Sequence, residues 1–152
     1  MIKPIRVYVE NSVFGGYFDK GFDVSTQKLF DLFNKGVYLP VISDHVTGEL
    51  NLGAPERVKN LLSSIKYEYH LVTEEMEILT SKYMNEGIVT PKYESDALHI
   101  AIATILNVDV LVSWNFRHIV NFNKLRLFNS VNIREGYKIL EVRTPEEVVE
   151  ND

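Results

Sequence analysis

Short apolar runs in this chain alternate with stretches of helical spacing. The β-branched and apolar runs predict strands over residues 5–9, 37–42, 67–72, 109–113 and 138–142. Apolar residues three or four positions apart predict helices over residues 11–18, 23–36, 44–52, 55–64, 73–87 and 96–106, and a broken helix over 117–132. This alternation predicts a single α/β domain over residues 1–152, with a central, mostly parallel sheet of about four to five strands flanked by helices on both faces.

Residues typical of helix ends mark several of these boundaries. Asn11 or Ser12 can cap the first helix, and Gly36 and Gly87 can end two later ones because glycine accepts a left-handed backbone. The segment Thr144-Pro145-Glu146-Glu147 has the spacing of a capping box, with proline at the first helical position. We therefore expect a last helix to begin there.

The amino-acid composition excludes several classes of site and function. The chain has no cysteine, which excludes disulfides, thiolate catalysis and cysteine metal sites and suits a reducing cytosol. No apolar run reaches the roughly 20 residues that span a bilayer, so we expect a cytoplasmic protein without membrane association. A net charge of −5 argues against a general nucleic-acid-binding protein but not against a nuclease, because acids at a metal site lower the total. A local basic rim could still form, or a solvated helix face in its place, from Arg117, His118, Lys124 and Arg126.

Three acids lie far apart in sequence, each where a strand or turn passes into a helix: Glu10, Glu49 and Asp96. In open α/β sheets ligands bind beyond the carboxyl ends of the strands, so these carboxylates can converge there. Carboxylate oxygens are hard ligands that suit Mg²⁺ or Mn²⁺. The simpler alternatives are an ion pair for Glu10, solvation for Glu49 and a helix-dipole interaction for Asp96.

Two stretches resemble the PIN-domain ribonucleases. They are Val7-Tyr8-Val9-Glu10-Asn11-Ser12-Val13-Phe14, and Ser95-Asp96-Ala97-Leu98-His99-Ile100-Ala101 followed by Asp109-Val110-Leu111-Val112-Ser113-Trp114-Asn115-Phe116-Arg117-His118. The PIN family includes the toxins of VapBC-type toxin-antitoxin pairs. The resemblance implies a Mg²⁺ or Mn²⁺ cofactor, an RNA substrate, a small antitoxin partner and a homodimer.

The resemblance also implies a role for individual residues. It assigns metal binding to Glu10, Glu49 and Asp96, and adds Asn115 to the catalytic set. Ser12, Ser113, Arg117 and His118 would support this site or contact substrate. Two positions depart from the family pattern, because Glu10 stands where aspartate is commoner and Asn115 where a fourth acid is frequent.

The residues and the resemblance are compatible with two functions. The leading hypothesis is a Mg²⁺- or Mn²⁺-dependent endoribonuclease, the toxin of a toxin-antitoxin pair. The alternative is a catalytically weakened PIN-like module that binds RNA or a protein. A nucleotide-binding enzyme is discounted, because Gly15-Gly16 lacks the spacing of a phosphate-binding loop. Among the other polar residues, we expect His99 to be a semi-buried histidine with its hydrogen bonds satisfied, with a metal ligand as the alternative, and the sequence suggests no partner for His45 or His70.

Overall fold

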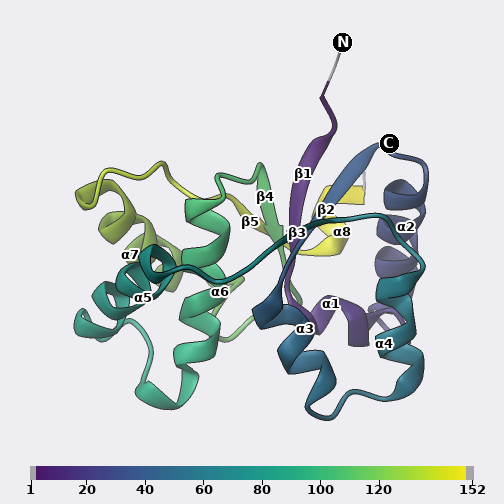
Figure 1. Cartoon of the computed structure of the whole chain (residues 1–152), viewed down its shortest axis with the longest axis horizontal. Coiled ribbons are helices and arrows are strands. Elements are labelled where there is room, and N and C mark those ends of the chain that lie inside the picture. Colours follow the sequence, from purple (N-terminus) through teal and green to yellow (C-terminus); the bar gives the residue numbers. More distant parts are fainter. Residues whose placement is uncertain (1–2, 150–152) are drawn as a thin grey trace.

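Five parallel strands form one sheet in the computed structural model, which describes residues 3–149 (Figure 1). The strand order is β3-β2-β1-β4-β5, and each neighbouring pair is parallel. Val7 in the central strand pairs with Pro40 on one side and with Val110 on the other. The strands are β1 (Ile5–Val9), β2 (Tyr38–Ser43), β3 (Glu68–His70), β4 (Val110–Val112) and β5 (Val142–Arg143). The predicted parallel sheet is confirmed; residues 1, 2 and 150–152 of the predicted domain lie outside the described residues.

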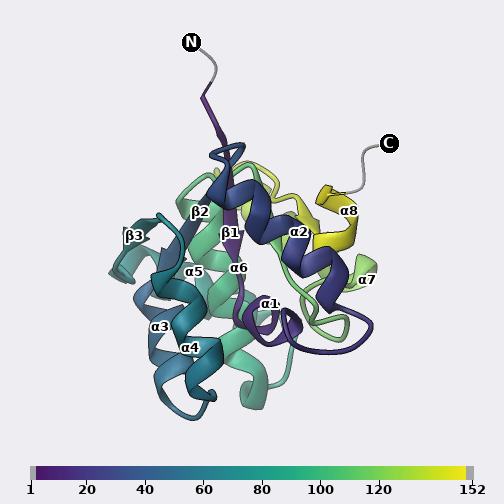
Figure 2. The same ribbon diagram turned by 90° about the vertical axis from the view of Figure 1, so that its right-hand side faces the viewer.

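Helices cover both faces of this sheet, as predicted. Figure 1 shows α5, α6 and α7 on one side of the strands, and the turned view in Figure 2 shows α1, α2 and α8 in front of the other side. The helices are α1 (Asn11–Gly16), α2 (Asp23–Asn34), α3 (Asp44–Asn51), α4 (Glu56–Ser63), α5 (Glu74–Asn85), α6 (Glu94–Ile105), α7 (Phe122–Arg134) and α8 (Pro145–Val149), with a 3₁₀ turn η1 (Pro91–Tyr93) before α6. Within residues 3–149 no helix combines the length and the apolar character that crossing a membrane requires.

The sheet and α6 form the centre of the core. Val7, Tyr8 and Val9 of β1 are fully buried, as are Leu111 and Val112 of β4. Burying one such aliphatic side chain stabilises the fold by roughly 1.5–3 kcal/mol. The small and apolar residues of α6 are buried on nearly every side of that helix: Ala97, Ile100, Ala101, Ile102 and Ala103. This close packing fixes the start of α6 relative to the strand ends.

Most of the predicted helix ends are confirmed. Gly36 (φ +74°) and Gly87 (φ +69°) adopt the left-handed conformation just after α2 and α5. At the start of α8, Glu147 N donates to Thr144 Oγ1 (3.2 Å) and Thr144 N donates to Glu147 Oε1 (2.9 Å), which is a capping box. The first helix differs from the prediction, because Glu10 caps it rather than Asn11 or Ser12.

The last strand was predicted over residues 138–142, and this placement is wrong. Strand β5 contains only Val142 and Arg143, beside the short β4. The backbone of Leu140 is occupied by the side chain of Asn129 in α7, whose Oδ1 accepts from Leu140 N (2.7 Å) and whose Nδ2 donates to Leu140 O (3.1 Å). These side-chain bonds hold the segment before β5 against α7 instead of in the sheet.

Candidate functional site

The carboxyl ends of β1, β2 and β4 lie at one edge of the sheet, because the three strands are adjacent and parallel. Glu10 follows β1 directly, Glu49 lies on α3 after β2, and Asn115 follows β4. Asp96 lies in the first turn of α6. A hydrogen bond from Ser95 Oγ to Glu49 Oε2 (2.6 Å) ties the start of α6 to α3. The predicted site residues therefore come from four elements that meet at this edge.

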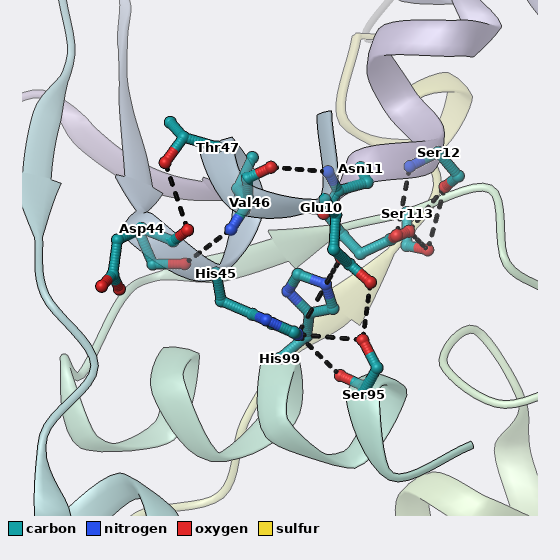
Figure 3. Close-up of polar contacts among 12 residues, drawn as sticks. Glu10, Asn11, Ser12, Asp44, His45, Val46, Thr47, Ser95, His99 and Ser113 are labelled. Carbon is teal, nitrogen blue, oxygen red and sulfur yellow. Dashed lines mark hydrogen bonds and ion pairs between the residues drawn. The ribbon is translucent and has the colours of Figure 1, made fainter. Parts of the chain in front are cut away.

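Glu10 is a buried carboxylate, 5% exposed, held by three donors. Its Oε1 accepts hydrogen bonds from Ser12 Oγ and Ser113 Oγ (both 2.6 Å), and its Oε2 accepts one from Ser12 N (3.1 Å) (Figure 3). Trp114 N in turn donates to Ser12 Oγ (2.8 Å). Buried charges are costly unless they are hydrogen-bonded, and these donors meet that need. Among residues 3–149, Ser12 N is the one partner of Oε2, so this oxygen keeps a lone pair that a cation could use.

Asn115 lies in the turn after β4. Its N–H donates to Ser113 Oγ (2.9 Å), and its Oδ1 accepts from Arg117 N (3.2 Å) and His118 N (3.1 Å). The amide oxygen that could serve as a ligand is thus used to build the turn. A catalytic role for Asn115 stays a prediction.

Asp96 is paired with His118. Asp96 Oδ2 lies 2.8 Å from His118 Nδ1, and the imidazole stacks against Tyr93 with ring centres 4.0 Å apart. The sequence predicts that His118 supports the site, contacts substrate or lies on a solvated helix face, and its side chain is only 6% exposed. The contact with Asp96 suits a supporting role.

Glu49 contacts two residues of α6. Its Oε1 lies 2.7 Å from His99 Nε2, and Ser95 Oγ donates to its Oε2. Burial on its own would raise the pKa of Glu49, but hydrogen bonds from His99 and Ser95 and the nearby imidazoles outweigh it and lower the pKa to about 2. Glu49 is therefore ionised at neutral pH.

Two histidines converge on Glu49: His99, and His45, for which the sequence suggested no partner. His45 Nε2 lies 3.9 Å from Glu49 Oε1 and 3.0 Å from Ser95 Oγ, as Figure 3 shows for its contact with Ser95. His99 is fully buried, and its Nδ1 lies 2.8 Å from the Tyr8 hydroxyl. The signal that could have found His45 is its position four residues before Glu49 on the same helix.

A basic and aromatic hollow borders Asp96. The Arg117 guanidinium lies 5.2 Å from the centre of the Tyr93 ring, and Lys92 Nζ lies 5.6 Å from it. The hollow is lined by Ile88, Thr90, Tyr93, Arg117, His118 and Lys124. Three of the four predicted rim residues line this hollow. Arg126 does not, because its guanidinium lies against Phe122 on α7, 5.9 Å from the ring centre.

The donor chemistry of these acids fits Mg²⁺ or Mn²⁺, because all three offer carboxylate oxygens. Within residues 3–149, however, the one group of three acidic or imidazole side chains with donor atoms all within 4.8 Å is His45, Glu49 and His99. Neither Glu10 nor Asp96 belongs to it. A shared metal site of Glu10, Glu49 and Asp96 stays a prediction.

Comparison with protein-family models and with curated proteins gives no match. Solved structures do resemble the fold, among them two toxin-antitoxin proteins. A chain of VapBC2 from Rickettsia felis, solved bound to a DNA fragment from the promoter, aligns with a TM-score of 0.58 at 16% identity, over 92% of this chain and 98% of that one. VapC20 from Mycobacterium tuberculosis, a toxin that cleaves the sarcin-ricin loop, aligns with a TM-score of 0.53 at 15% identity, over 73% and 91%. At these identities the likeness concerns the fold, and the chain therefore has the VapC-like PIN-domain fold that its sequence predicts.

Proposed function

We propose that this protein is a ribonuclease of the VapC toxin type that cleaves RNA phosphodiester bonds with Mg²⁺ or Mn²⁺ as cofactor. What supports the proposal is that Glu10, Glu49 and Asp96, each hydrogen-bonded to a neighbouring side chain, come from elements that lie at the same end of the sheet in a VapC-like fold. Glu10, Glu49 and Asp96 would hold the metal. When bound, such an ion orients water, lowers the pKa of that water and stabilises charge on the transferring phosphoryl group.

The surrounding residues have distinct supporting tasks in this proposal. Ser12 and Ser113 fix the Glu10 carboxylate through their hydroxyls. His118 fixes the Asp96 carboxylate through its Nδ1. The exposed Arg117 lies on the neighbouring turn, where its guanidinium can contact a phosphate of the RNA backbone.

Cleavage of a labelled structured RNA that includes a sarcin-ricin loop tests this function. The assay compares the wild-type protein with Asp96→Asn and, as control, Glu94→Gln, which alters an exposed acid in the first turn of the same helix. We expect Mn²⁺-dependent cleavage that Asp96→Asn abolishes and Glu94→Gln preserves. Equal cleavage by wild-type protein and Asp96→Asn would refute the assignment of Asp96 as a metal ligand.

A second candidate function is a PIN-like module that binds RNA or a protein without efficient cleavage. The use of Asn115 Oδ1 within its own turn favours this reading, because that oxygen already accepts two backbone N–H groups and is not free to bind a metal. Filter retention of the same RNA, without cleavage at millimolar Mn²⁺, would select the binding module. Cleavage under those conditions would exclude it.

The fold also supports a proposal about assembly. We propose a cytoplasmic homodimer that is restrained by a small antitoxin protein, in keeping with the VapC-like fold. Light scattering on the purified chain measures the mass of the assembly. A mass of one chain, 17.5 kDa, at all concentrations would contradict the dimer.

A further inference from the structure

We propose that His45, Glu49 and His99 form a binding site for a borderline transition-metal ion such as Zn²⁺. This site differs in donor chemistry from the all-carboxylate site of the proposed nuclease, although it shares Glu49 with it. Two imidazoles and one carboxylate suit Zn²⁺, whereas Mg²⁺ prefers oxygen ligands. The proposal stands whether or not the protein cleaves RNA.

The distances come close to those of a metal site. One donor atom from each residue lies within 4.8 Å of the other two. His99 Nε2 and Glu49 Oε1 are 2.7 Å apart, and His45 Nε2 and Glu49 Oε1 are 3.9 Å apart. Two ligands of a tetrahedral Zn²⁺, each about 2.0–2.1 Å from the ion, lie roughly 3.3 Å apart. The ion would therefore fit if His99 Nε2 moved slightly away from Glu49 Oε1 and His45 Nε2 moved slightly towards it.

His99 is already oriented for this role. Its Nδ1 lies 2.8 Å from the hydroxyl of Tyr8, and that hydroxyl lies 2.9 Å from Ser43 Oγ. All three residues are fully buried. Metal-binding histidines commonly donate their second ring N–H in such a hydrogen bond, which fixes the ring and directs the other nitrogen to the ion. Binding of Zn²⁺ at Nε2 would therefore release the Nε2 proton that faces Glu49 and leave Nδ1–H donating to the Tyr8 oxygen. Nε2 of His99 is thereby directed at Glu49.

His45 completes the site from α3. It precedes Glu49 by one helical turn, so both side chains project from the same face of the helix. The His45 and His99 rings lie 4.4 Å apart between centres, tilted by 41°. Ser95, whose Oγ contacts both His45 Nε2 and Glu49 Oε2, would support the ligands from α6. Because 34% of the Glu49 side chain is exposed, solvent can reach the site and supply a fourth ligand.

Zinc binding to the full-length, untagged protein tests the proposal directly. The metal is removed with a chelator, and Zn²⁺ affinity and stoichiometry are measured by calorimetry against a competing chelator, in excess Mg²⁺. We expect one Zn²⁺ per chain that Mg²⁺ does not displace. We expect His45→Gln to weaken binding by roughly 10-fold or more, as loss of a ligand should.

His70→Gln is the matched control, because His70 also contacts a glutamate, Glu68, but has no second histidine beside it in the described residues. It should bind Zn²⁺ as the wild type does. His99→Gln, checked for folding by circular dichroism, should weaken binding as His45→Gln does. Wild-type affinity in His45→Gln, or no stoichiometric Zn²⁺ binding by the wild type, would overturn the site. Because neither measurement uses RNA, failure here is distinct from failure of the nuclease proposal.

Discussion

The Tyr8 hydroxyl links the central strand to the candidate site, and its removal gives a clear test of this arrangement. The side chain is fully buried in β1, and its hydroxyl bridges Ser43 Oγ (2.9 Å) and His99 Nδ1 (2.8 Å). Burial raises the pKa of Tyr8 well above its ordinary value, so the hydroxyl remains protonated over the whole working range. Tyr8→Phe keeps the ring and removes only these two bonds.

The expected loss of unfolding free energy depends on which polar groups lose a hydrogen-bond partner in Tyr8→Phe. Ser43 Oγ still accepts from Val46 N (3.3 Å), but His99 Nδ1 has no other hydrogen-bond partner in the described residues. Leaving one buried polar group unsatisfied costs about 1–3 kcal/mol, and each lost hydrogen bond contributes about 1 kcal/mol net. We therefore expect Tyr8→Phe to lower the free energy of unfolding by about 2–3 kcal/mol.

Urea denaturation followed by circular dichroism measures this change. With a urea dependence of about 1–3 kcal/mol per molar, the loss of about 2–3 kcal/mol should lower the midpoint by roughly 0.7–3 M. The control is Tyr137→Phe, whose hydroxyl donates to Glu75 at an exposed site (2.6 Å) and whose loss should cost less than about 1 kcal/mol. Equal midpoints for the two variants would refute the idea that the buried hydroxyl bridge stabilises the site.

Three further predictions concern stability. Gly16→Ala places a Cβ 2.6 Å from the Trp114 ring, so it should displace the indole, cost about 1–3 kcal/mol and change the fluorescence of this single tryptophan; unchanged fluorescence would contradict the packing. Thr73→Ala removes the cap of α5 and should lower the urea midpoint by the equivalent of about 1 kcal/mol, and an unchanged midpoint would argue against this cap. Because the pKa of Glu49 is about 2 instead of 4.5, its contribution is complete above pH 4.5 and is lost as the pH falls towards 2. Glu49→Gln should reduce the loss of unfolding free energy between pH 4.5 and pH 2 by about 1–2 kcal/mol, after allowance for solvent screening. The same loss over this pH range in the wild type and in Glu49→Gln would refute the prediction.

The architecture was predictable because the local signals agree with the tertiary structure. The run Val110-Leu111-Val112 is fully apolar and lies inside the sheet, and Gly36 ends its helix as expected. The position of β5 was not predictable from local pattern. It depends on Asn129, eleven residues before Leu140, whose side chain occupies the backbone of Leu140. A side chain that takes the place of a backbone hydrogen bond between strands does not change the pattern of apolar and polar residues, so the sequence does not indicate it.

The candidate site likewise has a part that the sequence predicted and a part that it did not. Glu10 and Asp96 were found because one directly follows a strand and the other lies in the first turn of a helix, whereas Glu49, near the end of α3, was found through the family resemblance. Their partners were not, because the contacts of Asp96 with His118 and of Glu49 with His99 join segments 22 and 50 residues apart. The i, i+4 spacing of His45 and Glu49 was visible in the sequence and could have predicted that these two side chains lie on the same face of one helix.

The partners of the three acids differ in a way that bears on how a cation would enter. Asp96 and Glu49 each contact an imidazole, which can carry a positive charge, and each remains partly exposed. Glu10 is the most buried of the three, and its donors are two hydroxyls and a backbone N–H, none of which carries formal charge. A buried carboxylate without a cationic partner gains most from an arriving cation. We therefore expect a divalent ion to bind first to the Glu10 carboxylate. The side chains of Glu49 and Asp96, which are more exposed, would then move to contact the ion.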